Sequence, residues 1–150
     1  METTTQTNGA RAITLPPAGR HPDLPAPIAE STARVLGVFG ILVIGLIHIL
    51  DAVGTYQSTR WIFWAYMALI VAAVPVALSL LQWASPLVWA AAAGIALAPL
   101  AGFLWSRTIG LPGDAPDVGN WLCTLGMASL FIESWLLALC VTRFGVPPRP

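Results

Sequence analysis

Apolar residues are grouped into four long runs, and short polar connections separate them. The runs cover about residues 34–56, 61–83, 86–108 and 120–143. Each is long enough for a transmembrane helix, which needs roughly 20 apolar residues. Because the connections are short, consecutive helices must lie antiparallel to each other. The pattern predicts an all-α, polytopic membrane protein with four antiparallel transmembrane helices.

Residues that start and stop helices mark the ends of the runs. Ser85 is followed by proline, which is typical of a cap and a first helical residue. The Gly-Val-Pro-Pro sequence at 145–148 is expected to end the fourth helix. The hydroxyl residues expected to cap the first two helices are Ser31 or Thr32, and Ser58 or Thr59.

Three parts follow from this division. Residues 1–33 are rich in Thr, Pro, Ala and Gly, a composition typical of disorder, and are expected to form a cytoplasmic tail. Residues 34–145 form the transmembrane domain, and residues 146–150 form a short C-terminal tail.

The composition supports the membrane assignment. Hydrophobic residues make up 57% of the chain and charged residues 9%, whereas soluble domains contain about 25% charged residues. The formal net charge is zero and lysine is absent. The chain therefore has no basic patch for a nucleic-acid partner, and its first expected partner is the lipid bilayer.

The arginines predict the orientation of the bundle. Five of them lie in or next to the tails: Arg11, Arg20, Arg34, Arg143 and Arg149. The connections on the opposite side contain Arg60 and Arg107, with Asp114 and Asp117 nearby. The positive-inside rule then places both termini in the cytoplasm, in a multi-pass protein of the inner (cytoplasmic) membrane.

Small residues recur every fourth position along the third helix. They are Ala90, Gly94, Ala98 and Gly102, and Ser106 continues the series. Rows of this kind allow helix backbones to approach closely in lipid. We expect the row to be a helix contact, either within the chain or between protomers.

Two ionisable residues lie well inside apolar runs, His48 in the first and Glu133 in the fourth. At a rise of about 1.5 Å per residue, His48 lies roughly 12 Å from the level of Tyr56, and Glu133 roughly 18 Å from Trp121. An ionised glutamate at that depth costs several kcal/mol unless it is paired or faces a polar cavity. The two residues differ in depth by roughly 6 Å, within reach of each other directly or through a water.

Asp51 and Arg107 lie nearer to the predicted outer surface. Asp51 follows His48 by about one helical turn, and Arg107 can pair with Asp51, Asp114 or Asp117. Two interpretations stay open. Both concern the same four residues, which are His48, Asp51, Arg107 and Glu133. Either these residues line an outward-facing ligand-binding pocket, or they only hold the bundle together.

A metal site and a transport path are further possibilities. One imidazole and two carboxylates, from His48, Asp51 and Glu133, would suit zinc, manganese or iron. A haem with two histidine ligands would need a second chain, because His48 is the only histidine in an apolar run. The inner half of the membrane offers little for a transport path beyond Ser79, Gln82 and Cys140. No cofactor is strongly implied.

The segment 106–113 reads Ser-Arg-Thr-Ile-Gly-Leu-Pro-Gly. With a histidine late in the first run, and Ser129 and Glu133 in the fourth, it resembles a group of uncharacterised small four-helix membrane proteins of actinobacteria. The resemblance covers most of residues 34–143. It implies that His48, Arg107 and Glu133 belong to one set, and it implies no reaction.

Three functional hypotheses remain. The first is a non-enzymatic accessory, assembly or scaffold component that contacts another membrane protein or a second copy of itself. The second is binding or transport of a small molecule, ion or lipid at the outward-facing pocket. The third is an intramembrane metal-binding protein or an enzyme that uses Glu133 and His48 as an acid–base pair. The enzyme is the weakest, because no nucleophile motif accompanies the pair.

Overall fold

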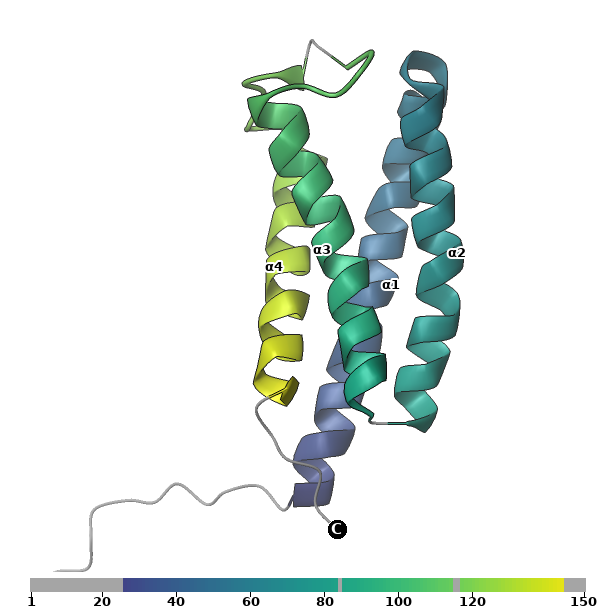
Figure 1. The fold of residues 1–150 in the computed structure, drawn as a ribbon, viewed down its shortest axis with the longest axis vertical. Helices are drawn as coiled ribbons and strands as arrows, with labels where there is room; N and C mark the ends of the chain where they lie inside the picture. Colours follow the sequence, from purple (N-terminus) through teal and green to yellow (C-terminus); the bar gives the residue numbers. More distant parts are fainter. Residues whose placement is uncertain (1–25, 84, 115–116, 145–150) are drawn as a thin grey trace, which may run out of the picture.

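Four helices form an antiparallel bundle (Figure 1). The computed structural model describes residues 26–83, 85–114 and 117–144. The helices are α1 (Ala26–Ser58), α2 (Arg60–Gln82), α3 (Pro86–Thr108) and α4 (Thr124–Phe144). All four are long and apolar enough to cross a membrane. The predicted fold class, an all-α bundle of four transmembrane helices, is confirmed.

The bundle consists of two hairpins that pack against each other. α1 pairs with α2 and α3 pairs with α4, while α1 also packs on α4 and α3 on α2. The helices that carry His48 and Glu133, α1 and α4, are therefore neighbours. Both described ends of the chain lie at one end of the bundle, here called the terminal end (Figure 1). The α3–α4 connection lies at the other end, here called the loop end.

Close approach of the helices depends on two glycines of α1. A Cβ atom on Gly37 would lie 3.1 Å from the Trp89 ring and 3.3 Å from Leu80. A Cβ atom on Gly40 would lie 3.0 Å from Trp135 and 3.3 Å from Leu136. These glycines bring the α1 backbone against the other three helices. The core around them is closed: Ile41, Ile44, Leu80, Ala92, Ala96 and Leu136 are at most 1% exposed.

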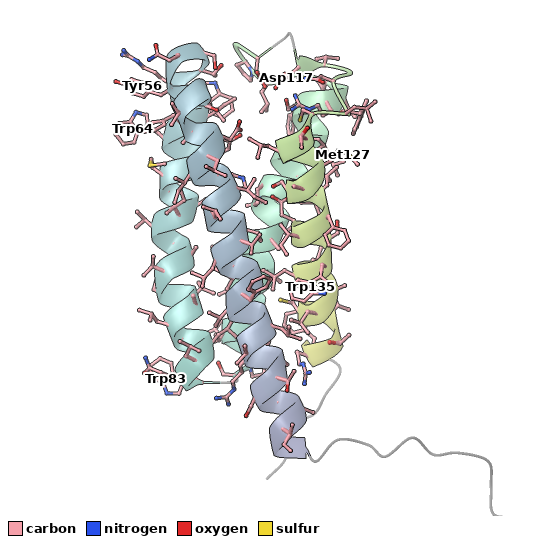
Figure 2. All side chains as sticks on the ribbon, turned by 180° about the vertical axis from the view of Figure 1, so that it is seen from behind. Tyr56, Trp64, Trp83, Asp117, Met127 and Trp135 are labelled. Atoms are coloured by element: carbon pink, nitrogen blue, oxygen red, sulfur yellow. The ribbon has the colours of Figure 1, made fainter. Side chains whose placement is uncertain are left out.

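Aromatic side chains mark both ends of the bundle. Figure 2 shows Tyr56 and Trp64 near the loop end and Trp83 at the terminal end. All three side chains are exposed. Exposed tryptophan and tyrosine at two levels are typical of the two membrane–water interfaces.

The boundaries of α3 match the prediction, and Ser85 accepts a hydrogen bond from the Val88 N–H at 3.3 Å. Thr59 occupies the predicted cap position of α2, although its hydroxyl makes no capping bond. The starts of α2 and α3 agree with the prediction because a hydroxyl residue directly precedes the apolar run in each case.

Two helix starts differ from the prediction. α1 begins at Ala26, so the assignment of residues 26–33 to the tail is wrong, and Ser31 and Thr32 lie inside the helix. The early start has a physical reason: Glu30 pairs with Arg34 one turn later at 3.3 Å, and Ala33 is 2% exposed in the core. Residues 1–25 and 145–150, which include the predicted tails, lie outside the described residues.

α4 begins at Thr124, four residues after the predicted start at residue 120. Asn120 donates its backbone N–H to Asp117 at 3.1 Å, and the Trp121 N–H bonds Gly119 at 3.0 Å. Gly119 has a φ of +81°, which favours glycine. These turn bonds hold residues 119–121 outside the helix, although Trp121 itself is apolar.

We expect Gly37→Leu to destabilise the bundle by about 1–3 kcal/mol, because the new side chain would overlap the buried Trp89 and Leu80. The control is Gly54→Leu, since no atom lies within 4 Å of a Cβ at that exposed position. The measurement is the midpoint of thermal unfolding of both variants in one detergent. Equal midpoints for the two variants would contradict the packing described here.

Candidate functional site

Arg107 is held by the connection that follows its own helix. It is 8% exposed, and its guanidinium pairs with the Asp117 carboxylate at 2.5 Å. It also donates to the Asp117 carbonyl at 3.2 Å and to the Cys123 sulfur at 3.4 Å, and it lies 4.8 Å from the centre of the Phe103 ring. Of the three carboxylates within its predicted reach, the structure selects Asp117.

The same connection is bound to α2. The Thr59 hydroxyl donates to the Gly113 carbonyl at 3.2 Å, and the Trp61 indole donates to the Pro112 carbonyl at 2.8 Å. Ser106 donates to Asp114 at 2.9 Å. The loop end therefore joins the two hairpins through hydrogen bonds to a loop that Arg107 orders. Asp117 lies at this end of the molecule (Figure 2).

Gly110 allows the chain to turn directly after α3. Its φ is +89°, a conformation that glycine adopts without a steric penalty. Its N–H bonds the Trp105 carbonyl at 3.0 Å, which is typical of a glycine-ended helix. The segment therefore ends α3 with a glycine turn, next to the ion pair of Arg107 with Asp117.

Asp51 and His48 meet Tyr66, a residue of α2. The Tyr66 hydroxyl donates to Asp51 at 2.9 Å, and its ring meets the His48 ring edge to face at 4.8 Å between centroids. His48 is 5% exposed, and its Nδ1 lies 2.8 Å from the Ile44 carbonyl. The contacts of Asp51 and His48 with Tyr66 thus join α1 to α2.

Glu133 is buried on α4 with one unpartnered oxygen. Its side chain is 0% exposed. The Ser129 hydroxyl donates to Oε1, and Oε2 has no hydrogen-bond partner among the described residues. Because these surroundings supply one donor and no cation, a negative charge at Glu133 would cost several kcal/mol.

The predicted set is thus divided among three places. His48 and Asp51 lie between α1 and α2, Arg107 lies at the loop end, and Glu133 lies inside α4's contact face. No hydrogen bond or ion pair joins His48 to Glu133 in the described part of the chain, so the predicted direct pair is not formed. The described residues also contain no group of three metal-ligating side chains, and His48, Asp51 and Glu133 do not assemble as a metal site.

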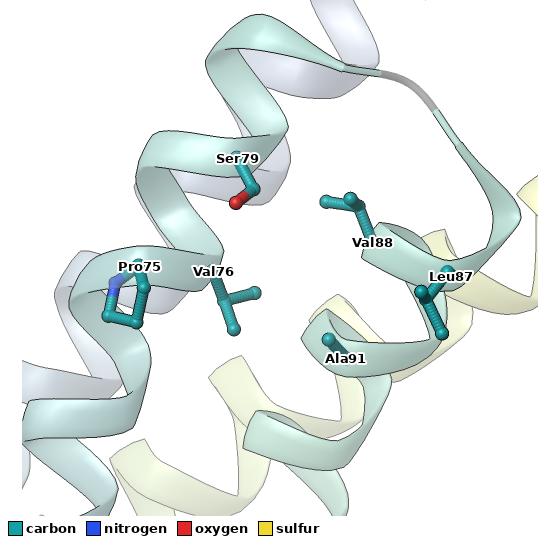
Figure 3. Close-up of a pocket in the computed structure, with 6 residues that line it drawn as sticks. All are labelled: Pro75, Val76, Ser79, Leu87, Val88 and Ala91. Carbon is teal, nitrogen blue, oxygen red and sulfur yellow. The ribbon is translucent and has the colours of Figure 1, made fainter.

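Surface pockets lie elsewhere on the molecule. One lies between α2 and α3, has a volume of about 220 Å³ and is lined by Pro75, Val76, Ser79, Leu87, Val88 and Ala91 (Figure 3). Another, of about 630 Å³, is lined by Met127, Leu130, Phe131, Ser134 and Trp135. Both are mostly apolar, and neither contains a residue of the predicted ligand-binding set.

The small-residue row of α3 faces away from the bundle. Ala90, Gly94 and Ala98 are exposed and Gly102 is half-buried. No atom of another helix lies within 4 Å of a Cβ placed on Gly94 or Gly102. α3 packs inward through a different face, which contains Trp89, Ala92, Ile95 and Ala96. The row therefore makes no helix contact within the described chain, and a contact with another chain stays a prediction.

Tyr66 is the polar residue that sequence reasoning missed. The signal was available in the hairpin geometry. Counting outward from the turn at Thr59 places Asp51 opposite residue 67, directly beside Tyr66. A tyrosine one position away, with its hydroxyl able to donate to a carboxylate, could have been chosen on that ground.

Comparisons with protein-family models, curated proteins and solved structures gave no match to this chain.

We expect Arg107→Gln to loosen the α3–α4 connection, because the Asp117 ion pair and the Cys123 contact are lost. Backbone amides between residues 109 and 123 should exchange hydrogen faster, by about tenfold or more for a loss of 1.4 kcal/mol. Arg60→Gln is the matched control, since Arg60 is an exposed arginine at the same end, over the Tyr56 ring. Unchanged exchange in Arg107→Gln would show that the loop does not depend on Arg107.

Proposed function

We propose that this integral membrane protein is a non-enzymatic accessory or assembly component of a membrane complex. The proposal places it in the inner (cytoplasmic) membrane with both termini in the cytoplasm, as the arginine distribution favours. Its partner would be a transmembrane helix of another membrane protein. The main support is the small-residue row of α3, which is turned outward while the polar residues are engaged inside the chain.

The use of the polar residues supports this role. Asp51 joins two helices through Tyr66, and Arg107 orders the loop that bonds to α2. Side chains used in this way stabilise a bundle and leave few donors free for a substrate. Neither of the two pockets described above offers a reactive polar group beyond a serine hydroxyl.

The geometry of the row supports a helix as the partner. Ala90, Gly94, Ala98 and Gly102 recur at the spacing of one ridge of an α-helix. In lipid, helix association is driven by close packing because apolar surface alone gives no advantage over the lipid tails. The ridge has no Cβ atom at Gly94 and Gly102, and no other helix covers these two positions. Another helix backbone could therefore approach closely there, as such packing needs.

The test is a double substitution, Gly94→Leu with Gly102→Leu, which fills the row at two positions where an added Cβ atom has no neighbour within 4 Å. We expect native electrophoresis of mild-detergent extracts to show the complex in the wild type and its loss in the double variant. Thermal stability should be unchanged, and Gly54→Leu should retain the complex. Two differently tagged copies that purify together would identify the partner as a second copy.

Either of two results would contradict the proposal. One is a wild-type protein that migrates as a single chain in every mild detergent. The other is a complex that persists in the double variant, because its interface would then lie on another face of the bundle.

Binding of a small molecule, ion or lipid is the second candidate, and the Glu133 carboxyl favours it. Its Oε2 atom is buried without a partner among the described residues. A proton or a polar group of a ligand could bind to this oxygen. His48, Asp51 and Arg107 would then supply the polar approach from the outer surface. This candidate requires that Glu133 be reachable from outside the core.

Glu133→Gln separates the two candidates. The amide keeps an acceptor for Ser129 and cannot ionise, so we expect thermal stability to stay within about 1 kcal/mol of the wild type. In wild-type membranes, the hydrophobic reagent dicyclohexylcarbodiimide should leave Glu133 unlabelled if the core is closed, as mass spectrometry of the α4 peptide would report. Labelling at Glu133 that is absent in Glu133→Gln would favour the binding site instead.

A further inference from the structure

Two arginines share one carboxylate at the terminal end of the bundle. Arg34 of α1 donates to Glu30 at 3.3 Å, and Arg143 of α4 lies 3.5 Å from the other oxygen of Glu30. The side chains of Arg34 and Arg143 are 28% and 22% exposed. We call Glu30, Arg34 and Arg143 the terminal-end cluster. It joins the two helices that carry the described ends of the chain.

The cluster has more positive charge and more donors than Glu30 can satisfy. Two guanidinium groups against one carboxylate leave a net charge of +1. Each guanidinium has five N–H donors, whereas Arg34 uses Nε and Arg143 uses one terminal nitrogen toward Glu30. Nε of Arg143 is buried and has no partner among the described residues. The contact of Arg143 with Glu30 is also long for a hydrogen bond.

Contacts between helices fix the depth of the cluster. Gly37 lies at the level of Leu80, so Arg34 and Trp83, each three residues further, lie roughly 5 Å beyond it in the same direction. Trp83 is 60% exposed, as is typical of a side chain in the headgroup region.

Arg143 lies at the same level on α4. Gly40 packs against Leu136. From that contact, Arg34 is six residues away and Arg143 seven residues away, which is roughly 9 and 10 Å toward the terminal end. Both guanidinium groups therefore lie at the level of the membrane–water interface that Trp83 marks.

We propose that Arg34 and Arg143 bind the headgroup phosphate of an anionic phospholipid. A phosphate oxygen offers an acceptor to the N–H donors that have no partner among the described residues. Guanidinium groups bind phosphate through paired hydrogen bonds. Both guanidinium groups contact the same carboxylate of Glu30, so they lie at one place on the bundle before a lipid binds. Basic pockets between transmembrane helices at this depth are typical sites for acidic headgroups.

The surroundings favour a lipid over a free phosphate ion. Val141 and Phe144 of α4 flank Arg143 and are 60% and 49% exposed. Exposed apolar surface next to Arg143 can contact acyl chains, and a soluble ion would gain nothing from it. The net positive charge of the cluster favours an anionic headgroup over a zwitterionic one.

The test places the full chain in lipid nanodiscs that contain either phosphatidylglycerol or phosphatidylcholine. We expect native mass spectrometry to find phosphatidylglycerol retained on the wild type, and phosphatidylcholine lost. The double variant Arg34→Gln with Arg143→Gln should lose phosphatidylglycerol retention by about tenfold or more. Arg60→Gln, which removes an exposed arginine at the loop end, should retain the lipid.

A second variant separates binding from folding. Glu30→Gln keeps both arginines and raises the charge of the cluster to +2, so phosphatidylglycerol retention should rise. Lower retention in Glu30→Gln would overturn the proposal, because it would mean that the ion pairs only hold α1 to α4. Equal retention of the two lipids by the wild type, or displacement of phosphatidylglycerol by inorganic phosphate, would also overturn it.

Discussion

Polar side chains inside the bundle must find their partners within the protein, because the hydrocarbon core of the bilayer supplies no donors or acceptors. The structure meets this constraint in different ways. Asp51 uses a hydroxyl from the neighbouring helix, and Arg107 uses a carboxylate from the loop that follows its own helix. Glu133 meets it only in part, since only one of its two oxygens has a donor among the described residues. The Nε atoms of Arg107 and Arg143 also have no partner in that part of the chain. The arrangement of loops and helices follows from where these partners lie.

The fold could be predicted from the sequence because its signals are local and strong. The third helix has an apolar run, a Ser-Pro start and a glycine two residues after its end, and its bounds are as predicted. The predicted start of the first helix is too late because residues 26–33 mix alanines with Glu30, Ser31 and Thr32 and so do not continue the apolar run. Their helix depends on the Glu30–Arg34 pair and on burial of Ala33, and neither can be read from hydropathy alone.

The candidate residues could be chosen from the sequence, but their partners could not. The rise per residue gives the depths of His48 and Glu133 in the membrane, and these depths are similar. Depth alone does not say in which direction each side chain points. Rotation about each helix axis decides the rest: His48 turns toward Tyr66, whereas Glu133 is enclosed on α4 with Ser129. The outward direction of the α3 row has the same origin, because a four-residue repeat marks a ridge without saying which neighbour it faces.

The hydrogen bond between Ser129 and Glu133 also bears on how the protein is made. The two residues lie one turn apart on the same helix, so their bond can form as soon as α4 is helical. α4 is the least apolar of the four spans, and it is the last to be synthesised. Because one oxygen of Glu133 is already hydrogen-bonded, the free-energy cost of moving this helix into the bilayer is lower. The serine therefore assists membrane insertion of α4 before any other helix has packed against it.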